Sequence, residues 1–348
     1  MMNRVVVIGG GVAGMQAALE LHKGGATPII IEREAQLGGK LNGWHVLFPT
    51  FTPAEDVVGE LRRRVRDAKI ECRMMAEAKG VTPKSITLKS GEIIACDAVV
   101  IASGFTLFDA RIKEEYGYSI YPNVYTTVDV EKMFNEGTLP TGEKAPKRIA
   151  LLHCVGSRDE KVCQSHCSRV CCITGVKQAI ELKERYPSAD IFNFYMDIRM
   201  FGAGYEEMYR DAQIRHNIHF VRGRISEAAP TFDDRIQIKA EDTLTGRPLR
   251  MSVDMLILIV GMKSNESNDA FAEQSALEQQ PSRFMKPKDN FLNNTSSNVE
   301  GIFYAGCVTA PKNAGDSINE GTHVAQAVAE YLSVSKPLEM QKLQQQQQ

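Results

Sequence analysis

The stretch Arg4-Val5-Val6-Val7-Ile8-Gly9-Gly10-Gly11-Val12-Ala13-Gly14 decides the fold, because it joins an apolar run directly to a glycine-rich turn. The run Arg4–Ile8 predicts a parallel strand buried on both faces. Helical spacing follows from Met15 to Lys23 and stops at Gly24-Gly25. Pro28–Glu32 predicts the next strand, so the chain opens with a strand–turn–helix–strand unit that is typical of a doubly wound sheet.

Three glycines of this turn have the spacing of a dinucleotide-binding fingerprint, Gly9-x-Gly11-x-x-Gly14, and Glu32 ends the following strand. Gly9 permits the tight turn, and Gly14 allows the helix to pack closely on the strand. Gly11 lets a pyrophosphate approach the backbone N–H groups at the helix N-terminus. Glu32 can accept hydrogen bonds from the adenosine ribose hydroxyls. The fingerprint by itself leaves FAD and NAD open.

A second unit of the same kind begins after the polar stretch 137–147, which contains two prolines and two glycines and predicts a linker. Residues 148–153 predict its first strand, 174–185 a helix and 190–195 a further strand. The unit closes with the buried strand 254–261. Its first turn carries one glycine, Gly156, so a pyrophosphate would lack a glycine-lined cradle there, and direct NAD(P)H binding by this unit is disfavoured.

The rest of the chain is consistent with a discontinuous first domain. Short strands surround Ser90-Gly91 between residues 81 and 96, and 97–104 predicts a buried strand that ends in small residues. An irregular stretch spans 263–298. The strand 301–306 follows it, and then a helix from about 317 to 332.

Length and charge limit the class of protein. A chain of 348 residues corresponds to about two domains. Its 41 Lys+Arg against 43 Asp+Glu leave a formal charge of −2, which argues against nucleic acid or an anionic membrane as the main partner. No apolar run approaches the ~20 residues of a membrane span, and the N-terminus does not resemble a signal peptide. We therefore expect a soluble, cytoplasmic protein.

Five of the eight cysteines fall within nineteen residues: Cys154, Cys163, Cys167, Cys171 and Cys172. The cluster contains no C-x2-C zinc knuckle, no ferredoxin run and no C-x-x-C redox pair. If the segment is helical, Cys163, Cys167 and Cys171 share one face. Five converging thiols would suit an iron–sulfur cluster, which needs four thiolates as ligands. A disulfide- or persulfide-handling site and buried free cysteines are the alternatives that spacing leaves open.

Two features beside the fingerprint resemble the thioredoxin reductase-like branch of the two-dinucleotide-binding flavoproteins. Gly38-Gly39-Lys40 follows Glu32 at short range, and Ala102-Ser103-Gly104 ends a strand in small residues. The late strand 301–306 resembles the family strand that ends in Gly-Asp beside the flavin ribityl chain, although Cys307 stands in place of the aspartate. The resemblance implies FAD, held by these residues: Gly9, Gly11, Val12, Ala13, Gly14, Glu32, Arg33, Gly39, Lys40, Leu41, Ala102, Ser103, Gly104, Gly306, Cys307, Lys312, Ser317 and Ile318.

Three further segments resemble the HdrA component of heterodisulfide reductases, and the resemblance covers nearly the whole chain. They are residues 153–159 (HCVGSRD), 167–172 (CSRVCC) and 197–207 (DIRMFGAGYEE). The resemblance implies a [4Fe–4S] cluster in the inserted unit. Its ligands would be Cys154, Cys167, Cys171 and Cys172, with Cys163 as the spare or alternative.

The resemblance also implies a role for Lys312. Pro311-Lys312-Asn313 resembles the family segment whose lysine approaches the flavin N5, and Lys312 is therefore the predicted catalytic residue. A solvated loop lysine is the alternative. The N-terminus of the last helix, near Asp316 and Ser317, could also direct its dipole at the flavin.

The predicted architecture is α/β, with two Rossmann-like, three-layer domains in a thioredoxin reductase-like arrangement. Residues 1–140 and 262–335 would form a discontinuous FAD-binding domain. Residues 146–261 would form an inserted domain with the iron–sulfur site, and 336–348 a tail that ends in glutamines.

The resemblance implies an oxidoreductase, an electron-transfer component that works within a multisubunit complex beside other iron–sulfur subunits, and a homodimer. Because no ferredoxin motif is present, the chain is more similar to the short form found in sulfur-oxidising bacteria, and electron bifurcation is not carried over. That form implies a role in cytoplasmic oxidation of sulfur compounds. An NAD(P)H-dependent disulfide reductase of the thioredoxin reductase type and a cysteine-based redox sensor are the alternatives.

Overall fold

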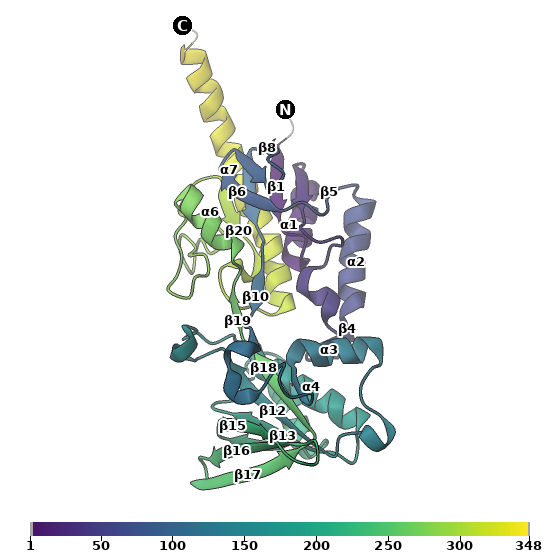
Figure 1. Ribbon diagram of the computed structural model, residues 1–348. Helices are drawn as coiled ribbons and strands as arrows, with labels where there is room; N and C mark the ends of the chain where they lie inside the picture. Colours follow the sequence, from purple (N-terminus) through teal and green to yellow (C-terminus); the bar gives the residue numbers. More distant parts are fainter. Residues whose placement is uncertain (1–2, 347–348) are drawn as a thin grey trace. The chain divides into compact units, whose positions relative to one another are not determined.

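The computed structural model describes residues 3–346, which form two compact units. The first unit consists of residues 3–42, 55–106 and 263–346, so the purple N-terminal and yellow C-terminal segments of Figure 1 lie in the same unit. The second unit consists of residues 43–54 and 107–262. Each unit is built around one five-stranded parallel sheet. The predicted α/β class with two parallel sheets is confirmed.

The sheet of the first unit has the order β20-β9-β1-β2-β5, and all its pairings are parallel. Its strands are β1 (Arg4–Ile8), β2 (Thr27–Ile31), β5 (Glu71–Arg73), β9 (Ala98–Ile101) and β20 (Ile302–Tyr304). β1 is central, and its apolar run is buried on both faces, as parallel strands between two layers require.

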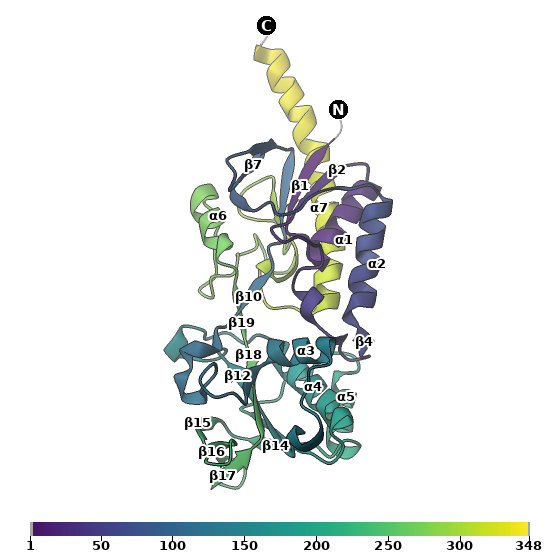
Figure 2. The ribbon, with the colours of Figure 1, turned by 45° about the vertical axis from the view of Figure 1, so that its right-hand side comes forward.

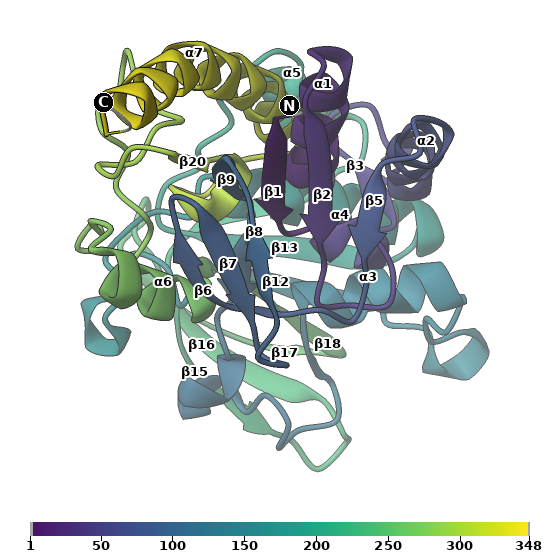
Figure 3. The same ribbon diagram turned by 90° about the horizontal axis from the view of Figure 1, so that it is seen from above.

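Two layers cover this sheet. One face packs against three helices that lie side by side in Figure 2, namely α1 (Val12–Lys23), α2 (Ala54–Asp67) and α7 (Ala314–Gln346). The other face packs against a three-stranded meander, visible from above in Figure 3, and against a short helix. These elements are β6 (Ala78–Thr82), β7 (Ser85–Leu88), β8 (Ile93–Ala95) and α6 (Ser267–Ser275).

The sheet of the second unit has the order β11-β18-β12-β13-β14 and is also parallel. Its strands are β11 (Val124–Thr126), β12 (Arg148–Val155), β13 (Asp190–Tyr195), β14 (His219–Arg222) and β18 (Met255–Val260). Alternate residues of β12 face opposite layers. Ile149 and Leu151 pack beneath the helices, whereas Ala150 and Leu152 pack against an antiparallel sheet.

The helices of this unit are α3 (Thr127–Glu136), α4 (Cys171–Arg185) and α5 (Tyr205–Ile214). The antiparallel sheet is formed by β15 (Ile225–Pro230), β16 (Ile236–Asp242) and β17 (Arg247–Val253). A small hairpin joins β3 (Val46–Leu47) to β4 (Thr52–Pro53). The strands β10 (Phe105–Leu107) and β19 (Met262–Ser264) lie where the chain passes from one unit to the other.

Buried charges hold residues 43–54 in the second unit. The backbone N–H of His45 donates to Glu131 Oε2 at 2.9 Å, and its ring Nδ1 lies 2.7 Å from Glu181 Oε1. Lys177 lies between the two carboxylates, 2.5 Å from Glu131 and 2.9 Å from Glu181. Burial of charged groups is tolerated only when they are paired, and the backbone and ring nitrogens of His45 give the two carboxylates beneath α3 and α4 further hydrogen-bond partners.

The structure differs from the sequence-based expectations in several places. The stretch 263–298 is not wholly irregular, since it contains α6. α7 begins at Ala314 rather than near 317 and continues to Gln346, through most of the stretch predicted as a tail; the last two residues of that prediction, 347–348, lie outside the described residues. Residues 107–140 and 43–54 cluster with the second unit, whereas the sequence analysis assigned both to the first. No helix among residues 3–346 is both long and apolar enough to cross a membrane.

Candidate functional site

Each fingerprint glycine in the first unit is required for a different reason. Gly9 has φ +106°, and a Cβ there would clash with the carbonyl of Ala102. A Cβ at Gly14 would clash with the carbonyl of Gly9, so helix and turn pack as closely as the pattern predicts. A Cβ at Gly11 would meet no protein atom within 4 Å. Packing within the protein therefore does not require glycine at position 11. The close approach of a ligand would require it.

The N-terminus of α1 fits an anionic group at this position. Gly11 is its N-cap and provides no side-chain hydrogen bond, so the first-turn N–H groups have no side-chain acceptor at the cap. Val12 and Ala13 are the first residues of the helix. Glu32 is buried and accepts hydrogen bonds from the N–H groups of Gly10 at 2.7 Å and Glu34 at 2.9 Å. These bonds fix the carboxylate beside the glycine turn.

Two further segments predicted to bind the cofactor surround this turn. The Gly39–Gly43 turn of 3-10 helix brings Lys40 and Leu41 beside it, and a Cβ at Gly39 would lie 3.1 Å from the Cα of Gly11. After β9, Ser103 donates from its hydroxyl to Asn268 at 2.7 Å. Gly104 has φ +71° and open space where a Cβ would stand. Arg33 is exposed and pairs with Glu34.

The late segment after β20 forms a buried polar cluster that the sequence did not predict. Gly306 has φ +73°, and its N–H donates to Glu320 Oε2 at 2.9 Å. The Lys312 ammonium lies 2.8 Å from the carbonyl oxygen of Gly306, 2.5 Å from Thr309 Oγ1 and 3.1 Å from Glu320. Burial raises the pKa of Glu320, and Lys312 opposes this effect. Lys312 is thus an ion-paired lysine just before α7 rather than a solvated one.

Cys307, which stands where the flavoprotein pattern has aspartate, is buried in the same cluster. Its thiol lies 3.5 Å from the carbonyl oxygen of Lys312 and 3.7 Å from the hydroxyl of Ser317. Burial raises the pKa of this thiol, so it behaves as a neutral group. Ser317 donates to the carbonyl of Asn313 at 2.8 Å, and Ile318 packs against the core beneath α1 and α7.

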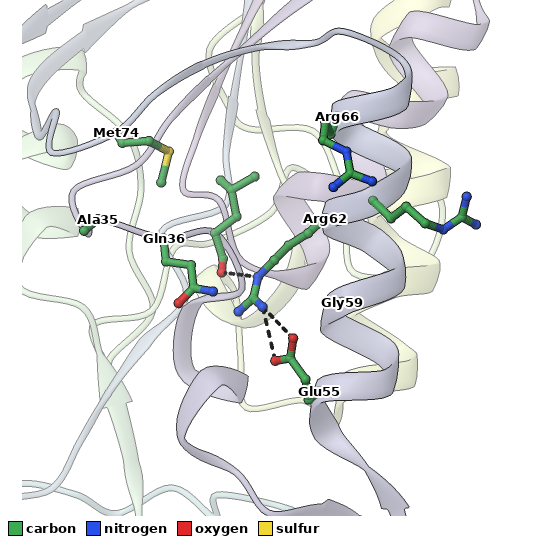
Figure 4. A pocket seen from close by; sticks show the side chains of 9 residues that line it. Ala35, Gln36, Glu55, Gly59, Arg62, Arg66 and Met74 are labelled. Carbon is green, nitrogen blue, oxygen red and sulfur yellow. Dashed lines mark hydrogen bonds and ion pairs between the residues drawn. The ribbon is translucent and has the colours of Figure 1, made fainter.

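A pocket of about 470 Å³ adjoins the predicted adenosine-binding stretch, and Figure 4 shows its lining. Ala35, Gln36 and Leu37 form one wall, and α2 contributes the other. Arg62 extends into it but is satisfied, since its guanidinium lies 2.8 Å from Glu55 and 2.9 Å from the carbonyl of Leu37. Because its guanidinium is paired within the protein, Arg62 lines the pocket without adding an unpaired charge to it.

In the second unit, the clustered cysteines come from three different local structures. Cys154 lies near the end of β12, where the strand register shifts, and has φ +62°. Cys167 lies in the following loop, and Cys171 and Cys172 are the first two residues of α4. The segment between 163 and 170 is not helical, because Cys163 and Arg169 both have φ near +56°, which a right-handed helix cannot contain. The shared helical face considered for Cys163, Cys167 and Cys171 does not exist.

Four of the five thiols are close enough to act on one another electrostatically. Burial is the largest cause that raises the pKa of Cys171, and Cys154, Cys172 and Cys167 raise it further. The pKa of Cys172 rises to about 12, first through burial and then through Cys154 and Cys167. Cys163 is exposed at the tip of the tight turn 159–164 and is not among the groups that shift these pKa values. The structure therefore brings Cys154, Cys167, Cys171 and Cys172 together and leaves Cys163 apart.

Several groups beside these thiols oppose the effect of burial and would stabilise a negative charge on sulfur. The backbone N–H of Arg169 donates to the Cys167 sulfur at 3.3 Å, and a backbone N–H of Arg199 stabilises the Cys172 thiolate. Arg158 acts on both Cys154 and Cys167, and its Nη1 is buried without a hydrogen-bond partner among the described residues. The thiols at the start of α4 also face the positive end of its dipole.

An iron–sulfur cluster fits this donor set. Four thiols, backbone N–H donors and the unpartnered Nη1 of Arg158 would meet a polyanionic group bound through sulfur. Within residues 3–346, no three His, Cys, Asp or Glu side chains are arranged to hold a single metal ion. A four-iron cluster takes its thiolates on different iron atoms and so does not require them to converge on one point.

A network of side chains fixes the cysteine loop. Ser157 Oγ donates to the carbonyl of His166 at 3.0 Å and lies 3.1 Å from Ser168 Oγ. Ser168 Oγ accepts from the N–H of Met262 at 2.8 Å, and the His166 ring lies 2.8 Å from the Met262 carbonyl oxygen. The loop is thereby tied to the chain that leaves β18, and Cys167 lies between two of these anchors.

Gly156 shows why this unit does not repeat the glycine turn of the first. It has φ +66°, and the ring of Phe108 fills the position that a Cβ would occupy. The space that is open at Gly11 is thus packed at Gly156. This packing agrees with the expectation that the second unit lacks a pyrophosphate cradle.

Asp159 is buried and joins the turn before the cysteines to two distant cations. Its carboxylate lies 3.0 Å from Lys113 and 2.8 Å from Arg224. Burial raises the pKa of Asp159, but hydrogen bonds from Lys113 and Arg224 outweigh it and lower the pKa below its usual value. Neither partner was singled out in the sequence, because Lys113 is 46 residues away and Arg224 65.

We predict that Asp159→Asn lowers the free energy of unfolding by about 3 kcal/mol at pH 7, since it removes the buried carboxylate that Lys113 and Arg224 share. A carboxylate with a lowered folded-state pKa stabilises the fold above its unfolded-state pKa of about 3.9 and loses that contribution as pH falls through the folded-state pKa. The difference between wild type and variant should therefore shrink below pH 4. Urea unfolding followed by circular dichroism measures it. Asp233→Asn, at an exposed ion pair with Arg235, is the control, and equal effects of both variants would contradict the prediction.

Comparison with known proteins agrees with this fold. Residues 3–329 match the family model described as pyridine nucleotide-disulphide oxidoreductase. Thioredoxin reductase of T. acidophilum superposes with a TM-score of 0.68 at 17% identity over 94% of this chain and 97% of that one. The Lactococcus lactis thioredoxin reductase (FR conformation) also gives 0.68 at 17% identity, over 95% and 99% of the two chains. At such identities these structures support the fold alone.

Two archaeal relatives, both of the HdrA type, are more similar in sequence. The iron–sulfur HdrA component of the CoB–CoM heterodisulfide reductase of Methanocaldococcus jannaschii is 35% identical over 87% of this chain. The corresponding component of the H(2)/formate:CoB-CoM heterodisulfide,ferredoxin reductase of Methanococcus maripaludis is 38% identical over 71% of it. The chain spans only 47% and 38% of the lengths of these two relatives. It belongs to the pyridine nucleotide-disulphide oxidoreductase family, with a thioredoxin reductase-like fold, a distant relationship to archaeal HdrA, and FAD as the cofactor that its family implies.

Proposed function

We propose that this protein is an FAD- and [4Fe–4S]-containing electron-transfer component of a heterodisulfide reductase-like complex. The observation that carries the proposal is the grouping of Cys154, Cys167, Cys171 and Cys172, two of which (Cys154 and Cys167) lie close to Arg158, whose Nη1 is buried without a partner among the described residues. When bound, FAD would convert two-electron chemistry into single-electron steps, and the cluster would pass single electrons on. Cys163 is the spare thiol in this proposal.

The geometry of the first unit supports the following roles for its residues. Gly11 and the N-terminus of α1 would hold the pyrophosphate, and Glu32 the adenosine ribose. Gly104 has open space where a Cβ would stand, whereas Gly39 packs closely against Gly11. Lys312 would supply positive charge near the flavin, with Glu320 as its counter-ion.

We predict opposite shifts of the flavin potential for the two members of this ion pair. A cation about 4 Å from a reduced flavin contributes ~4 kcal/mol at an effective dielectric of 20, which corresponds to ~90 mV for two electrons. Lys312→Met should lower the potential by up to about that amount, and Glu320→Gln, which leaves Lys312 without its counter-ion, should raise it. Dye-coupled redox titration measures both shifts. Unchanged potentials, or shifts of the same sign, would remove Lys312 from the flavin site.

The visible spectrum of anaerobically purified protein, before and after dithionite, tests the proposal. Flavin bands on a broad iron–sulfur shoulder, both bleached by dithionite, are the expected result, together with about four iron atoms per chain for one [4Fe–4S] cluster. Flavin bands alone, after supply of iron and sulfide, would favour thiol or persulfide chemistry. Iron without flavin would favour a redox sensor.

The finer assignments rest on resemblance. The short form found in sulfur-oxidising bacteria implies oxidation of sulfur compounds in the cytoplasm, further iron–sulfur subunits as partners, and a homodimer. The names of the archaeal relatives make them subunits of heterodisulfide reductases, which supports a place within a complex. An NAD(P)H-dependent disulfide reductase is the competing function, and the packed turn at Gly156 counts against it.

A further inference from the structure

A buried polar pair lies beneath the helix that begins with two of the grouped cysteines. His153 precedes Cys154 on β12, and its ring Nε2 lies 2.8 Å from the Oδ1 of Asn193 on β13. The His153 side chain is 2% exposed, and Asn193 is fully buried. Because an amide oxygen can only accept hydrogen bonds, the Nε2 of His153 carries the ring proton and donates it to Asn193.

The helix above this pair has a glycine where the imidazole ring requires one. A Cβ at Gly175 would lie 2.6 Å from the Cε1 and 2.8 Å from the Nε2 of His153. Gly175 lies in α4, four residues after Cys171. An interior glycine weakens a helix relative to alanine, so the close approach of the ring costs helix stability. In return, the first turns of α4 pack directly against the last part of β12.

The elements that the pair joins are also the elements that carry the cysteine group. Cys154 follows the histidine in β12, and α4 begins at Cys171 and Cys172. β13 leads to Asp197, whose backbone carbonyl accepts a hydrogen bond from the Cys172 thiol at 3.6 Å. The polar pair and its contact with α4 therefore connect the segments whose relative positions set the distances between the thiols.

The pair is unfavourable for folding by itself. Within residues 3–346, the Nδ1 of His153 and the Nδ2 of Asn193 are buried without a hydrogen-bond partner. A buried polar atom without a partner costs stability, and two apolar side chains of similar shape would fill the same space without that cost. Packing of the sheet against α4 therefore does not explain a histidine and an asparagine at these positions.

We propose that His153, Asn193 and Gly175 are positioning residues for the iron–sulfur site. They hold the end of β12 at a fixed separation from the first turn of α4, and thus Cys154 relative to Cys171. Groups that orient metal ligands raise the affinity for the metal and tune its potential, and their loss costs about 10- to 100-fold in affinity or activity. This inference rests on the proposed function, because the separation matters only if the cysteines hold a cluster.

The test uses the full chain, reconstituted anaerobically with FAD, iron and sulfide. The rate at which a ferrous chelator removes iron measures how firmly the cluster is held. Electron paramagnetic resonance of the dithionite-reduced protein and dye-coupled titration report the geometry and the potential of the cluster. Urea unfolding of the chain before reconstitution measures the stability of the fold separately.

The double variant His153→Leu/Asn193→Leu removes the hydrogen bond together with both unpartnered atoms. Iron should be lost about tenfold faster, with changed g values and a shifted potential, whereas the urea midpoint should equal or exceed that of wild type. His153→Gln, whose amide N–H can still donate to Asn193, should retain iron nearly as wild type does. The control is Gln178→Met, also buried on α4, which loses hydrogen bonds to Glu131 and the Thr127 carbonyl. It should lower the urea midpoint and leave the cluster unchanged.

Gly175→Ala tests the same contact from the helix side. Its methyl group would displace the ring, so iron loss should accelerate although alanine favours the helix. Gly59→Ala in α2, whose Cβ would meet only the side chain of Glu55, is the matched control.

Two results would overturn the positioning role and leave the proposed function standing. One is iron loss and resonance spectra equal to wild type in the double variant or in Gly175→Ala. The other is the same cluster change in Gln178→Met, since any disturbance of α4 would then suffice. If the double variant does not fold, Gly175→Ala decides. Wild-type protein without a cluster after reconstitution would overturn both this inference and the proposed function.

Discussion

Replacing Cys171 by alanine is expected to remove nearly all bound iron, whereas Cys163→Ala is expected to retain it. Cys171 is buried at the start of α4, and Cys154, Cys167 and Cys172 all act on its thiol. A cluster bound by four thiolates loses a ligand with any of these four residues, and no other described cysteine lies in this group. Cys163 is exposed and does not act on the others, so its loss leaves the donor set complete.

Iron and sulfide content and the absorbance of the iron–sulfur shoulder measure this difference in anaerobically reconstituted protein. For Cys171→Ala and Cys154→Ala we expect less than about a tenth of the wild-type iron, since metal affinity depends on every ligand. Flavin content serves as the internal control of folding, because the glycine turn belongs to the first unit. Full iron in Cys171→Ala, or its loss in Cys163→Ala, would contradict the ligand assignment.

Gly11→Val is expected to abolish FAD binding without unfolding the protein. A Cβ at this position meets no protein atom within 4 Å, so the side chain would enter the space in which the pyrophosphate has to approach the N-terminus of α1. We expect the Kd for FAD to rise at least about a hundredfold, equivalent to ~2.8 kcal/mol. Quenching of flavin fluorescence on titration of the apoprotein measures the Kd.

Gly14→Val provides the matched control for this argument. A Cβ at Gly14 would clash with the carbonyl of Gly9, so this variant should lose stability as well as FAD. The two variants therefore separate a glycine needed by the ligand from a glycine needed by the fold. If Gly11→Val binds FAD as tightly as wild type, or if its apoprotein melts as early as Gly14→Val, the pyrophosphate assignment is wrong.

Patterns local in the sequence predicted the fold well. The apolar run of β1, the glycine turn and α1 lie within twenty residues, so their spacing alone specifies strand, turn and helix. The buried strand β18 is likewise a continuous apolar segment. Between Cys163 and Arg169 the direction of the chain is set by backbone angles rather than by residue type. The sequence pattern therefore did not exclude a helix there.

The spacing of the cysteines left open which thiols form one group, and only the resemblance to HdrA narrowed the choice. In the structure, the positive φ of Cys154 and the start of α4 at Cys171 bring four of them into one group and leave Cys163 at the tip of a turn. Spacing counts residues along the chain, whereas grouping depends on where the end of β12 lies relative to the first turn of α4.

Residue patterns alone were enough to predict the two parallel sheets and the glycine turn, because burial and backbone freedom are set by residues next to one another. The charge partners became known only from the folded chain: Glu320 pairs with Lys312, and both Lys113 and Arg224 pair with Asp159. The last two pairs join residues 46 and 65 positions apart. Electrostatic pairing depends on distance in space, and no periodicity in the chain encodes it.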